Sequence, residues 1–553
     1  MEVNKSGMGA TLYYGGPICM HSHKGAKYAE AAVVRHDKFI FVGSLAGALA
    51  AAGQDCTHVN LDGRTMTPSF FEAHAHPNMA CLFDLREFTY AGSTPTPKEY
   101  IQNIREYLAG NPGFKSLRGG GWEIGVFADA YPTKEMLDEV STEIPIFLRD
   151  VSLHTVWVNS KALELAGVLQ AEPGESSETF PRDEKGEAIG VVVDLGTLAI
   201  EKALPPVSVE EEKALILKFQ NLLHERGVTG HMCALVEPNS EHYAAYRELL
   251  SQGKLKMYSQ LAFCAAPQNY KEAFEWLCKE RAAHKSENTE GVLELGLTKF
   301  FIDGIFASET AYLIDDYASH QGWRGEALWP TDLEAITEAF RLCAEYGFRI
   351  HIHAIGDAAT HFALDALEAG STPNRHGIAH NQLVCPEDFA RYQKLEIIAN
   401  INSYWFAKGV HFADIELAKL GYERSERMHP SKSFYDAGIR VTMASDYPVT
   451  ADPNPLGALY VAVNRTCPPA FRFGKSAEEC TLNANEAVTI DQAFDAFSLS
   501  AAYAYGLDEI TGSIEAGKSA DFVIWDQNIL RGVDLSEKLL ETWFKGELVY
   551  KAK

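Results

Sequence analysis

The chain contains 553 residues, of which 46% are hydrophobic and 22% are charged, so it can bury a large core. A rule of about 150 residues per domain overcounts when a barrel is present, so one large domain with one smaller domain fits this length. The formal net charge of −26 argues against nucleic acid or an anionic membrane as a partner, because phosphate contacts need clustered lysine and arginine.

The ten cysteines include no CxxC pair, which disfavours a disulfide framework or a cysteine zinc site and suits a reducing cytosol. Residues 1–16 lack a basic region followed by an apolar core, and no stretch approaches the ~20 apolar residues that span a bilayer. We therefore expect a cytoplasmic protein that acts on a small-molecule amide and binds neither nucleic acid nor membrane. We also expect a homo-oligomer, namely a dimer.

Short apolar runs separated by turns occupy both ends of the chain. These runs are residues 10–16, 31–43, 512–526 and 541–553. Neither end is large enough to bury a core alone, so we expect residues 1–66 and 509–553 to pair with one another as a small β domain.

Between the two ends, near-continuous apolar strands alternate with helical segments, a pattern typical of a parallel sheet covered by helices. The expected strands are residues 65–76, 227–238, 256–266, 295–304, 348–357, 376–384, 395–405 and 439–449. Eight such strands close a (β/α)8 TIM-like barrel, which we expect over residues 67–508. Residues 85–205 are too long for one loop, so they predict an inserted lobe over the barrel mouth.

Two histidines, His74 and His76, end the first expected barrel strand. Residues i and i+2 of a strand point to the same face, about 6 to 7 Å apart along the backbone, which is a chelating geometry. An isolated pair of this kind could equally be hydrogen-bonded core histidines. The other strands must decide between the two interpretations.

Further polar residues lie where active sites of such barrels are found, at the carboxyl ends of the strands. His353, His380 and Asp446 each end a strand, and Lys299 lies deeper within one, where a long side chain can reach up the barrel axis. His351 faces the interior one pleat below His353. We therefore assign the ligand role to His353 and a packing or supporting role to His351.

Each of these residues has a structural alternative. Lys299 could be a snorkelling barrel lysine, His380 a hydrogen-bonding partner of a helix, and Asp446 an N-cap. Five independent structural roles at the same end of five strands are less expected than any one of them alone. Side chains that are costly to bury are rarely repeated at one place without a functional cause. Histidine and carboxylate ligands favour Zn²⁺ or a similar divalent ion.

The set of motifs is similar to that of the amidohydrolase superfamily, specifically its family 3 branch, which includes N-substituted formamide deformylases. The resemblance extends nearly end to end. It rests on residues 63–76, 157–168, 299–304, 353–357, 444–449 and 512–526. The chain departs from the branch pattern at Ser69, usually glycine, and at Glu72, usually aspartate, and we do not expect either to abolish metal binding.

The resemblance implies a (β/α)8 barrel with a small β-sandwich built from both termini, and a centre with one or two metal ions. His74, His76 and Asp446 would bind the more buried ion, and the remaining two histidines the second. Lys299 matches the position of a carboxylated lysine that bridges two ions in many members. A carbamate would replace a repelling ammonium by a bridging carboxylate, which nearby divalent charge favours.

The mechanism we expect is hydrolysis of an amide-type C–N bond. Zn²⁺ lowers the pKa of its bound water to about 7 and so supplies hydroxide at neutral pH. Asp446 would take the water proton and pass it to the leaving amine. His154 is a candidate donor to the oxyanion, although it could be a structural histidine of the lobe.

Aromatic residues of the lobe and of the seventh strand's loop could line a substrate pocket. Trp122, Tyr404 and Trp405 are the candidates. Aromatic pockets bury apolar ligand parts, so an amide with a bulky or aromatic N-substituent is the expected substrate, although aromatic stripes are more often core.

Two competing hypotheses remain at this point. The first is a mononuclear deaminase or a cyclic amidase on the same fold. Deaminases of this pattern usually carry a glutamate shortly after the fifth-strand histidine, whereas this chain has Asp357 there. The second is a catalytically inactive regulatory homologue, which would be free to lose ligands, whereas this chain keeps all six candidates.

Overall fold

The computed structural model describes residues 9–21, 25, 27–77, 96–122, 124–127, 131–150, 155–170, 179–193, 196–285, 291–410, 412–533 and 535–553. The chain forms two compact units, one made of residues 1–76 with 217–553 and the other of residues 77–216. No helix among the described residues is both long and apolar enough to cross a membrane.

Eight parallel strands form the barrel of the larger unit, and they are adjacent in the order in which the chain visits them. The strands are β6 (Phe70–Ala75), β11 (Val228–Val236), β12 (Tyr258–Cys264), β13 (Leu293–Phe301), β14 (Arg349–Ala354), β15 (Gly377–His380), β16 (Ile398–Asn402) and β17 (Val441–Ala444). All residues of β6, β14 and β17 are buried, as expected of a parallel sheet covered on both faces. The predicted TIM-like barrel is confirmed.

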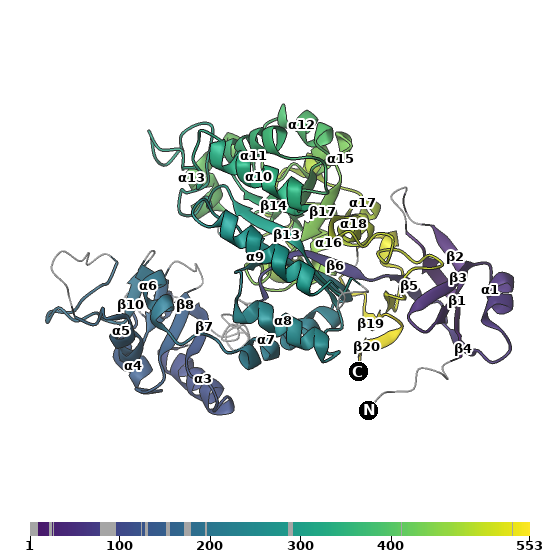
Figure 1. Ribbon diagram of the computed structural model, residues 1–553, viewed down its shortest axis with the longest axis horizontal. Coiled ribbons are helices and arrows are strands. Elements are labelled where there is room, and N and C mark those ends of the chain that lie inside the picture. Colours follow the sequence, from purple (N-terminus) through teal and green to yellow (C-terminus); the bar gives the residue numbers. More distant parts are fainter. Residues whose placement is uncertain are drawn as a thin grey trace. The chain divides into compact units, whose positions relative to one another are not determined.

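Helices follow the strands (Figure 1), and α9, α10, α11, α17 and α18 pack against strands of the barrel. In α10, Ile336, Ala339, Phe340 and Cys343 are buried, at the spacing that places one apolar stripe toward the sheet. The helices are α7 (Val209–His224), α8 (Glu241–Ser251), α9 (Tyr270–Ala283), α10 (Glu334–Tyr346), α11 (Asp357–Gly370), α12 (Asp388–Lys394), α13 (Ala418–Leu420), α14 (Tyr422–Ser425), α15 (Ser431–Asp436), α16 (Pro455–Asn464), α17 (Ile490–Phe497) and α18 (Leu499–Tyr505).

The barrel closes where the last strand, β17, meets the first, β6. Just beyond β17, Asp446 donates its backbone N–H to His74 O at 3.0 Å, and His76 donates to Tyr447 O at 2.7 Å. The Glu72 carboxylate accepts the N–H of His74 at 3.2 Å and lies 3.0 Å from the N–H of Ser445. We call this junction the seam, and it carries three of the predicted metal ligands.

Strands from both ends of the chain form one eight-stranded sheet in the same unit, as the purple and yellow strands of Figure 1 show. The order is β20-β19-β18-β5-β1-β2-β3, with β4 paired to β1. The bounds are β1 (Thr11–Cys19), β2 (Tyr28–Arg35), β3 (Lys38–Gly43), β4 (Thr57–Asn60), β5 (Thr65–Pro68), β18 (Phe522–Trp525), β19 (Leu539–Phe544) and β20 (Glu547–Lys551), with helix α1 (Leu45–Ala52) following β3.

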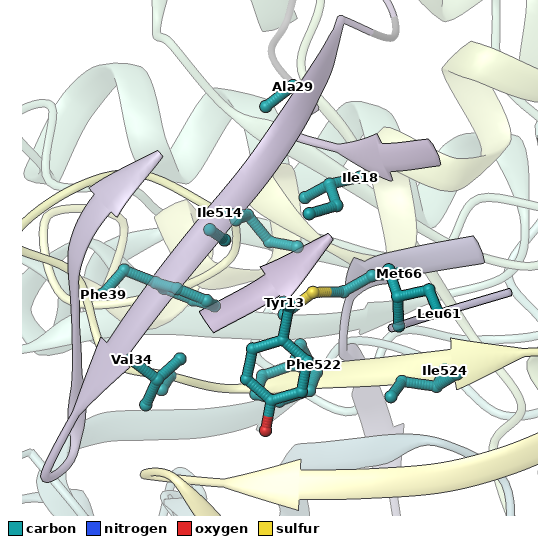
Figure 2. Close-up of a cluster of buried hydrophobic side chains, with 12 residues drawn as sticks. Tyr13, Ile18, Ala29, Val34, Phe39, Leu61, Met66, Ile514, Phe522 and Ile524 are labelled. Atoms are coloured by element: carbon teal, nitrogen blue, oxygen red, sulfur yellow. The ribbon is translucent and has the colours of Figure 1, made fainter. Parts of the chain in front are cut away.

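A hydrophobic cluster joins these two ends (Figure 2). Tyr13 packs edge-to-face against Phe522, with ring centroids 5.3 Å apart, and Met66 lies in the same cluster. The first expected strand, residues 65–76, is in fact two strands. Its first part, β5, pairs with β18 in the terminal sheet, and after Ser69 the chain enters the barrel as β6.

The unit of residues 77–216 has a four-stranded sheet in the order β10-β9-β8-β7. Its strands are β7 (Leu117–Trp122), β8 (Ile146–Asp150), β9 (Thr155–Val158) and β10 (Val191–Val193), and its helices are α3 (Pro97–Gly110), α4 (Lys134–Asp138), α5 (Ser160–Ala166) and α6 (Gly196–Ala203). Strands β7 and β8 are parallel, whereas the other pairs are antiparallel. This compact unit follows β6 in the chain, and its assignment as a lobe inserted over the barrel mouth stays a prediction.

Candidate metal centre

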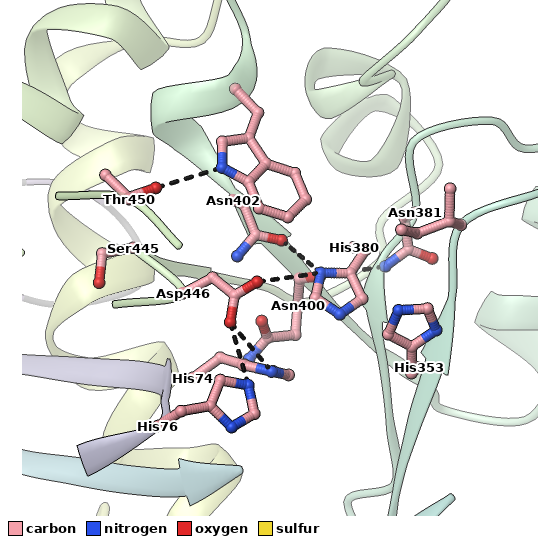
Figure 3. Close-up of polar contacts among 12 residues, drawn as sticks. His74, His76, His353, His380, Asn381, Asn400, Asn402, Ser445, Asp446 and Thr450 are labelled. Carbon is pink, nitrogen blue, oxygen red and sulfur yellow. Dashed lines mark hydrogen bonds and ion pairs between the residues drawn. The ribbon is translucent and has the colours of Figure 1, made fainter. Parts of the chain in front are cut away.

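The seam places two histidines against one carboxylate (Figure 3). Asp446 Oδ1 lies 3.2 Å from His76 Nε2 and 3.5 Å from His74 Nε2. The HxH pattern thus has the predicted consequence, since alternation along β6 aims both rings at the same point. All three side chains are buried, and a buried polar or charged group is costly unless it has a partner.

His380, the last residue of β15, completes the group. Ligand-type atoms of His74, His380 and Asp446 all lie within 4.8 Å of one another, and in the described part of the chain no other set of three such side chains does so. The ring of His353 lies next to that of His380, with centroids 4.5 Å apart. The structure therefore brings together five of the six predicted ligands at the carboxyl ends of four strands.

The sixth predicted ligand, Lys299, lies below them in the barrel. In the sheet register it is level with His351 on β14, two residues before His353. Its side chain is fully buried, and its Nζ has no hydrogen-bond partner. Burial lowers the pKa of Lys299 to about 7, opposed by the charge of Asp446.

The ionisation of these groups suits metal binding. Burial lowers the pKa of His353 and of His380 to about 3, so both rings are neutral and keep a lone pair at physiological pH. Burial alone would raise the pKa of Asp446, but the hydrogen bond from His76 and the positive charge of Lys299 bring it below its ordinary value. The site thus offers neutral imidazoles and an ionised carboxylate.

Two buried nitrogens, His74 Nε2 and Lys299 Nζ, lack hydrogen-bond partners. An unsatisfied buried polar group costs about 1 to 3 kcal/mol, so such groups need an explanation. Nitrogen and carboxylate donors in this arrangement match the ligand preference of Zn²⁺ and similar ions. The residues present therefore fit a divalent metal.

Outer side chains hold the ligand rings. His351 Nε2 lies 2.8 Å from His74 Nδ1, and Asn402 Oδ1 lies 2.9 Å from His380 Nδ1. Each contact fixes which nitrogen faces the cluster, since Nδ1 is occupied and Nε2 is left free. His351 therefore supports His74, which lies far from it in the sequence.

Several supporting residues were not predicted from the sequence. Asp303 lies within the family motif at residues 299–304, but the sequence assigned it no role. In the structure its Oδ1 lies 3.2 Å from His353 Nδ1. Asn400 and Asn402, two residues apart on β16, contact Ala73 O and His380 Nδ1, and this pair of polar residues on one face of an apolar strand could have identified them. Glu72, noted as a departure from the family, ties the seam together, and burial raises its pKa to about 8.

Two of the candidate ligands have an unusual backbone. His380 has φ of +76° and Asp446 has φ of +59°, the left-handed region that non-glycine residues rarely adopt. Such conformations cost of order 1 to 3 kcal/mol and concentrate at functional sites. Other non-glycine residues in the described chain also adopt this region, so here it describes how these two ligands are held.

The predicted substrate residues fall in different places. Trp405 stacks on the ring of His380, with centroids 5.5 Å apart and planes 8° from parallel, and donates Nε1–H to Thr450 Oγ1 at 3.2 Å. Tyr404 donates its hydroxyl proton to Asn454 O at 2.7 Å. Trp405 is thus beside the cluster, whereas Tyr404 anchors the loop.

The other two predictions concern residues 77–216. Trp122 is buried in the hydrophobic core of that unit and donates Nε1–H to Leu148 O at 2.9 Å, so its role in substrate binding stays a prediction. His154 lies outside the described residues, and its role as an oxyanion donor also stays a prediction.

The amidohydrolase family profile matches residues 57–550. The chain belongs to the amidohydrolase family. This result confirms the predicted family and the predicted class of enzyme, an amidohydrolase. The match covers the barrel, residues 77–216 and the later strands of the terminal sheet, and it begins after β1, β2 and β3.

Two curated relatives are similar over most of their length. The N-substituted formamide deformylase of Arthrobacter pascens is 26% identical over 95% of this chain and 95% of its own. The exoenzymes regulatory protein AepA of Pectobacterium carotovorum subsp. carotovorum is 28% identical over 66% of this chain and 79% of its own. An uncharacterized metal-dependent hydrolase from Pyrococcus horikoshii OT3 shares the fold, with a TM-score of 0.75, 20% identity, and coverage of 95% of this chain and 99% of that one.

Proposed function

We propose that this protein is a metal-dependent hydrolase that cleaves the amide-type C–N bond of a small molecule with a bulky or aromatic N-substituent. The observation that carries the proposal is the buried Asp446 carboxylate, ionised and within 3.5 Å of two histidine nitrogens at the carboxyl edge of the barrel. The similarity to an N-substituted formamide deformylase supports an amide over other C–N bonds.

We assign the metal as one or two divalent ions, with zinc as the expected ion. His74, His76 and Asp446 would hold the first, and His353 with His380 the second. Lys299 would bridge them as a carbamate, a role supported by its depth, its unpartnered Nζ and its lowered pKa, since an uncharged amine is the form that reacts with carbon dioxide. Bound there, the ion would polarise the amide carbonyl and acidify a water.

The chain's own residues would then move the protons. Asp446 accepts a proton from the attacking water as the water oxygen bonds to the carbonyl carbon. It returns that proton to the nitrogen as the C–N bond breaks, so that a carboxylic acid and a neutral amine are formed. The left-handed backbone of Asp446 and its contact with His76 hold the carboxylate in place for both transfers.

Trp405 supports the aromatic part of the proposal. Its ring lies beside His380, so a substituent on the substrate nitrogen could pack against it while the reacting carbonyl faces the cluster. Aromatic pairs in such offset contacts add about 0.5 to 1.5 kcal/mol beyond their buried area. A formyl or acyl amine with an aromatic N-substituent is the class we expect to be cleaved fastest.

A deaminase or cyclic amidase on the same fold is the competing chemistry. In the deaminase, an acid shortly after the fifth-strand histidine moves the proton. Asp357 has that place, but its carboxylate accepts the backbone N–H of Ile314 at 2.9 Å and of Ala358 at 3.0 Å. It therefore serves as an anchor for a loop, which favours amide hydrolysis with Asp446 as the shuttle.

A regulatory function without catalysis is supported by the name of one relative, AepA. Elemental analysis of the purified protein separates the two cases. We expect one to two divalent ions per chain, loss of amidase activity on chelation and recovery on adding zinc.

A screen of N-formyl, N-acyl and cyclic amides with the metal-loaded protein identifies the substrate. A fully active preparation without metal would refute the proposal.

Lys299→Ala tests the bridging carbamate. We expect loss of one ion and most activity, with partial recovery on adding a short carboxylic acid, because the acid supplies the missing bridging oxygens. Lys299→Met keeps the bulk and is the matched variant for packing. A crystal structure at full metal occupancy with an unmodified Lys299 amine directed away from the ions would contradict this role.

A further inference from the structure

Two of the ligand-type histidines, His74 and His380, have their Nδ1 atoms held by neutral side chains. His353 differs, because its Nδ1 lies 3.2 Å from an Oδ1 of a carboxylate, that of Asp303. The two atoms are within ion-pair distance but not aligned as a full hydrogen bond, as is common in sites that tighten when the ligand binds.

The Asp303 carboxylate is fixed by backbone groups. It lies two residues beyond β13, is 1% exposed, and accepts the N–H of Ile355 at 3.0 Å, of Gly356 at 2.9 Å and of Tyr312 at 3.0 Å. Gly356 is required there, because a Cβ would lie 1.9 Å from the carbonyl oxygen of Tyr312. Three donors from two loops leave the carboxylate no freedom to rotate.

We propose that Asp303 is a positioning residue for His353: it accepts the Nδ1–H and so fixes the tautomer in which Nε2 carries the lone pair toward the metal cluster. This inference rests on the proposed metal-dependent function. A carboxylate also makes the imidazole a stronger donor than the neutral partners of the other two rings do. The ion held by His353 should therefore depend on Asp303 more than the ion at the seam does.

Asp303→Asn keeps the shape and removes the negative charge. Asp357→Asn is the matched control, because Asp357 also holds a backbone N–H of the loop that contains Tyr312, yet it has no contact with His353. We expect Asp303→Asn to weaken zinc binding by about 10- to 100-fold, the usual cost of losing such an outer partner, and Asp357→Asn to stay within about threefold.

Zinc affinity is measured by competition with a chromophoric chelator, without substrate, and unfolding is measured by heating. A purely structural role predicts that both variants lose thermal stability while their zinc affinities match the wild type, and that result would overturn the inference. If the wild type itself binds no metal, the proposed function fails instead. The visible spectrum of the cobalt-loaded protein gives a second readout, which should change in Asp303→Asn alone.

A double variant shows whether Asp303 acts through His353. In the His353→Gln background, adding Asp303→Asn should cause no further loss of zinc affinity, whereas independent effects would add. Should Asp303→Asn fail to fold, a crystal structure of the zinc-loaded wild type still decides. Nε2 of His353 on the ion with Nδ1 facing Asp303 supports the inference, and Nδ1 on the ion refutes it.

Discussion

Strand β15 carries a buried histidine at each end, and the two are held in opposite ways. His376, just before the strand, accepts the N–H of Ile350 at Nδ1 and contacts Thr372 O through Nε2, at 3.0 and 2.8 Å. His380, at the other end, has only its Nδ1 held by a partner and has a left-handed backbone. Both ring nitrogens of His376 have partners within the protein, whereas Nε2 of His380 is left for a ligand.

The same contrast holds for the two ends of the barrel. Near its amino end, the buried Asp521 carboxylate contacts Tyr258 Oη at 3.1 Å, Thr511 Oγ1 at 2.7 Å and the N–H of Lys545 at 2.7 Å. At the carboxyl end, the buried His74 Nε2 has no hydrogen-bond partner. These two buried groups thus differ in whether the protein itself supplies their hydrogen-bond partners.

The largest effect expected from this contrast is that of Asp446→Asn. The variant keeps the shape of the side chain but loses its basicity, so the attacking water loses its proton acceptor and the leaving nitrogen its donor. We expect kcat to fall by about 10² to 10⁴, with a much smaller change in KM.

Kinetics and metal content on the amide found in the screen test this prediction. Asp521→Asn is the matched control, because it alters a buried carboxylate at the opposite end of the barrel, and its kcat should stay near the wild-type value. If Asp446→Asn retained metal and a kcat within about threefold of wild type, Asp446 would not be the proton shuttle.

His376→Leu should reduce stability rather than activity. It leaves the N–H of Ile350 buried without a partner, whereas the carbonyl of the exposed Thr372 can bind water instead, so we expect a loss of about 1 to 3 kcal/mol. Urea unfolding measures the change. Zinc content and kcat of the folded protein should not change, and a loss of zinc would show that the two ends of β15 are not independent.

The same histidine predicts a pH dependence. Burial lowers the pKa of His376 from its ordinary value to about 4, so the unfolded chain binds more protons between the two values, and stability falls as the pH drops through that window. Its share of the loss between pH 7 and pH 5 is about 2 kcal/mol. His376→Asn can still accept the N–H of Ile350 but does not titrate, so its unfolding free energy should decline less over this range. If the unfolding free energies of the variant and the wild type declined equally with pH, His376 would not be a source of the pH dependence.

Trp405→Ala should have the smallest effect and the most selective one. Losing an aromatic contact beside His380 should raise KM for amides with an aromatic N-substituent by about two- to tenfold. The KM for an N-methyl analogue should change little. Trp405→Phe is the conservative comparison, and an equal rise for both substrates would argue against an aromatic pocket at this position.

Much of the barrel and most of the candidate centre could be predicted from the sequence. Apolar runs mark the strands, and a polar residue directly after such a run lies at the carboxyl edge, which is how His380 and Asp446 were identified. Lys299 was placed below the others by its position inside a run, and the register with His351 agrees.

Contacts between distant loops were beyond the sequence. Nothing in the sequence near Asp303 shows that its carboxylate meets Tyr312 and Gly356, because those contacts depend on how two loops fold over one another. The division of residues 65–76 at Ser69 was also missed, since β5 and β6 follow one another almost without a break in the sequence and only their partner strands differ. Periodicity identifies a strand, but it does not identify the sheet to which the strand belongs.

The seam determines at which stage of synthesis the proposed metal site can form. The two histidines of β6 leave the ribosome early, whereas Asp446, which faces them, follows the last barrel strand and leaves late. The terminal sheet has the same requirement, because β5 pairs with β18. We therefore expect a nascent chain to complete the proposed metal site at the seam only after nearly complete synthesis.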